Sequence, residues 1–82
     1  MRRVATTVRC VPRFGYAGTN VRTVDLDLPS GAEPEALQTT LEAWFNRRGI
    51  ADAVFSIDVD DDGYFAVVND EAYDADWGTP LL

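Results

Sequence analysis

The run Asp58-Val59-Asp60-Asp61-Asp62-Gly63 is where residue types and spacing come closest to a defined chemistry. It matches D-x-D-x-D-G, the first half of a calcium-binding loop in which carboxylates at alternate positions converge on one cation. The match stops there, because the twelfth position is Asn69 and a bidentate glutamate is needed at that place. Asp58, Asp60 and Asp62 therefore remain only a weak candidate for a divalent cation. The same run equally suits the polar tip of a hairpin.

The rest of the composition excludes most catalytic chemistry. The 82 residues include no histidine and no lysine, and the only serines are Ser30 and Ser56. Without a histidine, no hydroxyl or thiol has the usual base beside it, and no nucleophile–base pair can be assembled. The single cysteine, Cys10, lies in an apolar run and predicts a buried, inert thiol. We predict a protein that is not an enzyme and has no cofactor.

Charge is sorted along the chain. Residues 1–24 carry five arginines and no acid, and residues 25–82 carry all fourteen acids. The net charge of −7 disfavours direct binding to nucleic acid, because phosphate neutralisation needs a basic surface. It favours a basic protein surface as the partner. We expect the aspartates of the C-terminal half to form one common outward patch.

The last ten residues, 73–82, mix acids with large apolar groups. Tyr73 and Trp77 are four residues apart, so one helical turn brings them together. Two interpretations stay open for these aromatic side chains. They dock back onto the core or the uncovered sheet face, or they anchor a partner, since tryptophan and tyrosine are enriched in interfaces.

These features favour a small, non-catalytic, acidic binding or inhibitor protein. It would present carboxylates to the basic, nucleic-acid-binding site of a partner protein, as a DNA mimic of the anti-CRISPR or anti-restriction kind carried by phages and mobile elements. The alternative is a small structural or assembly protein that forms a homodimer or larger oligomer through an uncovered sheet face. The candidate partner-binding residues are Asp58, Asp60, Asp61, Asp62, Asp74, Asp76, Tyr73 and Trp77.

The sequence also bears on the compartment. One unpaired cysteine fits a reducing cytosol. Met1-Arg2-Arg3 begins like a signal peptide, but Thr6, Thr7 and Arg9 interrupt the apolar stretch that should follow. We therefore expect a cytoplasmic protein, the cytoplasm of a host cell included, with no membrane partner.

Two strands precede a helix. Residues 3–11 and 21–28 alternate apolar and polar side chains, which is typical of half-buried strands. The outward Arg3 and Arg9 of the first could lie opposite Asp25 and Asp27 of the second, and such pairing favours an antiparallel arrangement.

The helix is expected to begin at Pro34, although Ser30 and Glu33 form a competing capping-box pattern. Its apolar stripe contains Leu37, Leu41, Trp44 and Phe45. Gly49 should end the helix in the left-handed conformation.

Residues 53–69 predict a hairpin. A three-residue loop, Asp61-Asp62-Gly63, would place Phe55 and Phe65 on one face and Asp58 and Asp60 on the other. We prefer this register to one with an Asp62-Gly63 turn because it separates apolar from charged side chains. The apolar face should then lie beneath the helix.

The order is ββαββ, an α+β fold in which a four-stranded, mostly antiparallel sheet carries one helix on one face. Residues 1–72 should form a single domain, and residues 73–82 an acidic-aromatic tail. The stretch from Val21 to Ile50 resembles the second strand and helix of ubiquitin-like β-grasp domains. That resemblance implies a β-grasp-like sheet; a split sheet is the alternative topology.

Overall fold

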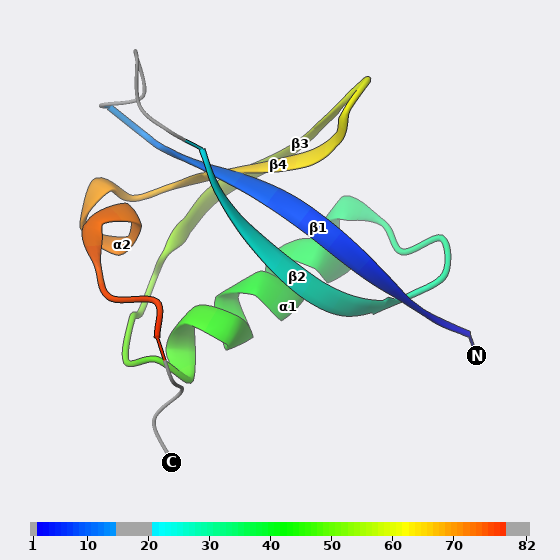
Figure 1. Ribbon diagram of the computed structural model, residues 1–82, viewed down its shortest axis with the longest axis horizontal. Coiled ribbons are helices and arrows are strands. Elements are labelled where there is room, and N and C mark those ends of the chain that lie inside the picture. The colour runs from blue at the N-terminus through cyan, green and yellow to red at the C-terminus, as the bar shows by residue number, and fades with distance from the viewer. Residues whose placement is uncertain (1, 15–20, 79–82) are drawn as a thin grey trace.

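The computed structural model describes residues 2–14 and 21–78. The elements follow the predicted ββαββ order, with one short helix added at the end (Figure 1). They are β1 (Arg3–Pro12), β2 (Arg22–Pro29), α1 (Pro34–Asn46), β3 (Val54–Asp60), β4 (Gly63–Val68) and α2 (Asp70–Asp74). Within the described ranges, no helix is long and apolar enough to cross a bilayer.

The four strands form one continuous sheet in the order β2-β1-β4-β3. β1 pairs antiparallel with β2, β3 pairs antiparallel with β4, and the two central strands, β1 and β4, run parallel. The α+β class and the mostly antiparallel sheet are therefore confirmed. The continuity of the sheet rules out a split arrangement and agrees with the β-grasp-like alternative.

Helix α1 covers one face of this sheet. Leu37, Leu41 and Phe45 form its buried stripe, and each is 0% exposed. Beneath them lie inward side chains of the first two strands, namely Val8, Cys10, Val24, Leu26 and Leu28. Burial raises the pKa of the Cys10 thiol to about 12, so this thiol stays protonated at neutral pH.

The ends of α1 are set by local chemistry. The helix begins at Pro34, as predicted, with Glu33 at the N-cap position and no capping hydrogen bond from a side chain. Gly49, at φ 80°, ends the helical segment. The Gly49 amide donates to the Asn46 carbonyl at 3.0 Å and the Ile50 amide to the Phe45 carbonyl at 3.0 Å, the bond pattern of a glycine-terminated helix.

The predicted register of the hairpin is wrong by one residue. Asp60 pairs with Gly63 around a two-residue Asp61–Asp62 turn, and Asp58 pairs with Phe65. Because side chains alternate along a strand, this shift turns Phe65 and Val67 away from α1 and onto the same face as Asp58. A β-bulge between Val54 and Ser56 leaves Phe55 half exposed as well.

Packing against the helix explains the observed register. The side chains of Ala66 and Val68 are 0% exposed beneath α1. The Tyr64 hydroxyl donates to the Ala32 carbonyl at 2.9 Å, which fixes Tyr64 on the helix side. Ala66 fills this buried position, and Phe65 lies half-buried on the opposite face of β4.

The charge pairing predicted between the first two strands is also wrong, although their antiparallel direction is correct. Arg9 lies opposite Thr23 and Arg3 opposite Pro29. Arg3 donates to the backbone carbonyl of Asp27 at 2.8 Å, and Asp25 accepts from the Thr7 hydroxyl at 2.6 Å. The register leaves Arg9 free to contact the β3–β4 hairpin.

The substitution Leu41→Ala should lower the free energy of unfolding by about 2–5 kcal/mol, because it opens a cavity in a fully buried stripe. Val59→Ala is the matched control, since Val59 is 59% exposed and should change stability by only about 0.5 kcal/mol. Urea denaturation followed by circular dichroism measures both. Equal losses would place Leu41 outside the core.

Candidate functional site

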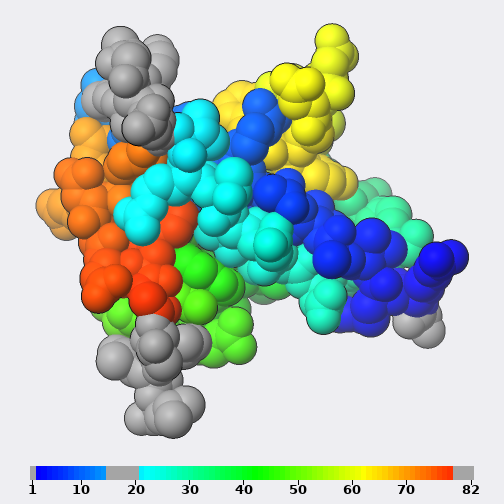
Figure 2. All heavy atoms as spheres, in the orientation of Figure 1, coloured from blue at the N-terminus to red at the C-terminus, as the bar shows by residue number. Residues whose placement is uncertain are grey.

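The β3–β4 hairpin tip stands out from the body of the protein as a prong (Figure 2). Asp58, Asp61 and Asp62 are all exposed on it. Within the described ranges, these three carboxylates take part in no ion pair. The prong therefore presents uncompensated negative charge to solvent.

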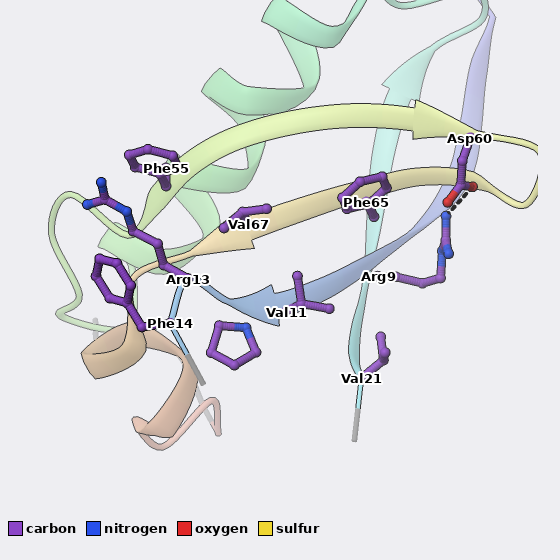
Figure 3. A pocket seen from close by; sticks show the side chains of 10 residues that line it. Arg9, Val11, Arg13, Phe14, Val21, Phe55, Asp60, Phe65 and Val67 are labelled. Carbon is purple, nitrogen blue, oxygen red and sulfur yellow. Dashed lines mark hydrogen bonds and ion pairs between the residues drawn. The ribbon is translucent and has the colours of Figure 1, made fainter. Parts of the chain in front are cut away.

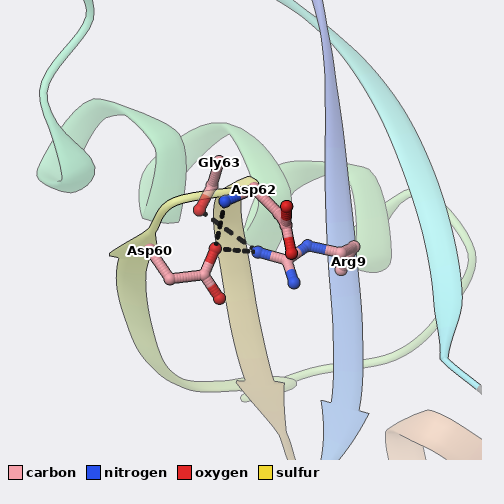
Figure 4. Close-up of polar contacts among 4 residues, drawn as sticks. All are labelled: Arg9, Asp60, Asp62 and Gly63. Carbon is pink, nitrogen blue, oxygen red and sulfur yellow. Dashed lines mark hydrogen bonds and ion pairs between the residues drawn. The ribbon is translucent and has the colours of Figure 1, made fainter.

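Asp60 differs from its neighbours, because Arg9 binds it (Figure 4). Arg9 Nη2 donates to Asp60 Oδ1 at 2.6 Å and to the Gly63 carbonyl at 3.2 Å. The Asp62 amide also donates to Asp60 Oδ1, at 2.9 Å. The Arg9 hydrogen bond is the main cause that holds the pKa of Asp60 below its usual range. Arg9 thus ties the tip to β1.

The acids of the C-terminal segment lie elsewhere. Asp74 and Asp76 are exposed, at the side of the protein that carries α2. Figure 1 places α2 and the hairpin tip at opposite ends of the fold. The single outward patch expected from the sequence is therefore not formed. The structure has instead two separate groups of predicted site residues: the acids of the tip, and the C-terminal segment, where the Tyr73 and Trp77 rings lie 6.3 Å apart as expected.

Tyr73 and Trp77 pack against the core. The Trp77 ring lies 5.1 Å from the Phe45 ring and 5.5 Å from the Trp44 ring, edge to face in both cases. Its indole Nε1 donates to the Ala72 carbonyl at 2.7 Å. This geometry corresponds to the first of the two interpretations, docking onto the core.

Two arginines hold the segment that carries these aromatic rings. The Arg22 guanidinium lies 3.7 Å from the Trp77 ring centroid and donates to the carbonyls of Tyr73 and Ala75. Arg48 donates to the Gly78 carbonyl at 3.0 Å. A partner could use Trp77 as an anchor only after these contacts were broken.

The sheet face opposite α1 forms an open groove of about 640 Å³ (Figure 3). Apolar side chains from all four strands or the residues next to them line most of it, namely Val11, Pro12, Phe14, Val21, Phe55, Phe65 and Val67. The Arg9–Asp60 pair lies at one end of the groove. Arg13 lies at the other, between the rings of Phe14 and Phe55, at 4.7 and 3.8 Å from their centroids.

Sequence reasoning missed this groove because it placed Phe55 and Phe65 beneath the helix. One signal was available. Val11 is one of the β1 residues whose side chains point away from the core, and a face exposed to solvent would normally carry a polar residue at that position.

Asp58, Asp60 and Asp62 do not make a metal centre in this structure. Across residues 2–14 and 21–78, no three carboxylate or thiol side chains come together as ligands.

No protein-family model matches the chain, and neither a curated protein nor a solved structure is significantly similar to it.

The substitution Asp60→Asn should destabilise the protein at neutral pH, because it removes the ion pair with Arg9. The pKa of Asp60 is lower in the folded state, so its stabilisation is complete above the ordinary carboxyl pKa of about 4 and is lost as the pH falls below it. The stability difference between wild type and Asp60→Asn should therefore shrink on acidification. Urea denaturation over a pH series measures it.

Asp61→Asn is the control for this experiment, because it removes a charge from the same turn and leaves the Arg9 contact in place. The same pH response in both variants would show that the Arg9 contact is not its source.

Proposed function

We propose that this protein is a small non-catalytic inhibitor whose acidic hairpin tip binds the basic, nucleic-acid-binding site of a partner protein. The observation that carries the proposal is the projecting prong with exposed Asp58, Asp61 and Asp62. A prong can enter a cleft that a flat acidic surface cannot reach.

The chemistry of the tip supports a basic target. Arginine recognises carboxylates and phosphates through the same planar, two-pronged hydrogen bonding. A groove built to bind the phosphates of nucleic acid can therefore accept closely spaced carboxylates in their place. This equivalence is the physical basis on which the protein would act as a DNA mimic.

Local repulsion also supports a binding role. Adjacent Asp61 and Asp62 occupy the two turn positions, and like charges so close together destabilise the fold that carries them. Arg9 compensates the negative charge of Asp60, but the charges of the neighbouring aspartates on the prong are not compensated. A cationic partner would remove that repulsion on binding.

The C-terminal acids support the proposal less well. Asp74 and Asp76 adjoin a segment whose aromatic residues are packed into the fold. We therefore restrict the proposed surface to the tip and treat Glu71 and Asp74 as the reference group.

The test uses the immobilised chain to retain proteins from the source-cell lysate at low salt. The retained partner should be a nucleic-acid-binding protein, should lose its nucleic acid when this chain is added, and should be released at high salt. Asp61→Lys combined with Asp62→Lys should weaken its binding at least about tenfold, or about 1.4 kcal/mol.

Glu71→Lys combined with Asp74→Lys is the matched control. It makes the same change in net charge on the α2 side and should leave the affinity within about twofold of wild type. The proposal fails if no protein is retained, if the partner binds no nucleic acid, or if the tip variant binds as tightly as wild type.

A further inference from the structure

We infer that the open sheet face binds a second copy of this chain, in a two-fold dimer that sets Arg13 of each copy against Asp58 of the other. This dimer would use the groove and not the turn, so it does not depend on the proposed inhibitor function.

Exposed apolar surface is the first reason to expect an occupant. Five large apolar residues are exposed in the described part of the chain, and three of them line the groove. Phe14 is 76% exposed, Phe55 50% and Val21 48%. A contiguous exposed patch of this kind in a small domain indicates an interaction surface.

Charge at the two ends of the face is the second reason. Arg13 follows β1, where its amide donates to the Val68 carbonyl at 2.8 Å, and its guanidinium lies over the Phe55 ring. Asp58 lies three residues further along β3, on the same face as its pairing partner Phe65. Neither Arg13 nor Asp58 has an ion-pair partner within the described ranges. The face thus has an unpaired cation over Phe55 and an unpaired anion at Asp58, and three residues of β3 separate these two positions by about 10 Å.

The charges on this face are complementary to those of a second copy whose strands run in the opposite direction. Consider two copies packed face to face about a two-fold axis that lies between the sheets, perpendicular to the strands. The axis reverses strand direction and keeps β3 opposite β3, so Arg13 faces the partner's Asp58 and Asp58 faces the partner's Arg13. Because the interface is isologous, both ion pairs form together. Val67, which pairs with Ser56 between the two charged ends, then lies near its centre.

The opposite packing direction is disfavoured by the same charges. A two-fold axis along the strands would set the arginine end of one face against the arginine end of the other. Repulsion between two such cations, with apolar side chains around them, would oppose that dimer.

A second copy of this chain fits the open face better than an unrelated protein does. An unrelated protein would need an acid opposite Arg13, a base opposite Asp58 and an apolar strip between them, whereas a second copy supplies all three. The protein is also thin, at 36 × 35 × 17 Å, because α1 covers one face of its sheet and no other described element covers the second. Packing two open faces would bury apolar side chains on both sheets at once, as in a sandwich about 10 Å between sheets.

The experiment measures the mass of the purified chain by sedimentation over a range of concentrations. Wild type should show a concentration-dependent dimer. Arg13→Glu and Asp58→Arg should each weaken dimerisation at least about tenfold, because each places like charges opposite one another. The double variant should recover most of the wild-type affinity, since it restores both ion pairs with their direction reversed.

Two controls separate the dimer from other causes. Circular dichroism should show every variant folded, since both side chains are exposed. Phe55→Ser should weaken the dimer without changing charge, whereas Val59→Ser, on the other face of the same strand, should not. A monomer at every concentration, or a dimer that is indifferent to Arg13→Glu, would overturn the inference.

Discussion

One helix can cover only one face of a sheet, and this constraint governs the whole molecule. α1 has 13 residues and so extends about 20 Å, and it lies across a four-stranded sheet. Its stripe of Leu37, Leu41 and Phe45 closes a core with one face of the sheet. The short α2 and the residues after it cover one end of this core, and nothing in the described ranges covers the second face. The open groove follows from that asymmetry.

The hairpin tip is held by Arg9 at the end of the sheet where β1 and the hairpin separate. The last paired residues of β1 and β4 at this end are Arg9 and Phe65, and beyond them β1 and the hairpin diverge (Figure 1). The Arg9 side chain extends from β1 to the hairpin at this point and donates to both Asp60 and the Gly63 carbonyl. A single arginine thus compensates one of the tip carboxylates and leaves the others exposed. The cation–π contact of Arg9 with Phe65, at 5.6 Å, joins the acidic tip to the apolar groove.

Arginine has three distinct uses in this chain, and all seven positively charged side chains are arginines. Arg22 holds the C-terminal segment by donating to backbone carbonyls and stacking on Trp77. Arg9 binds a carboxylate. Arg13 lies between two aromatic rings and contacts no acid in the described ranges. A planar guanidinium can donate at its edge and stack on its face at once, whereas an ammonium cannot. The arginines that cluster in the N-terminal part of the sequence therefore act at separate places in the fold.

The sequence by itself determined the element order, the helix from Pro34, its buried stripe and the burial of Cys10. These features depend on local periodicity and on glycine and proline stereochemistry, and both can be read from neighbouring residues. Only the tertiary structure decided the hairpin register, because a two-residue and a three-residue loop are both compatible with Asp61-Asp62-Gly63. The choice depended on whether Ala66 or Phe65 fits beneath α1, which is a contact between distant residues. That one-residue difference placed Phe65 on the open face beside Asp58, the β-bulge added Phe55, and together they make the groove that sequence reasoning did not find.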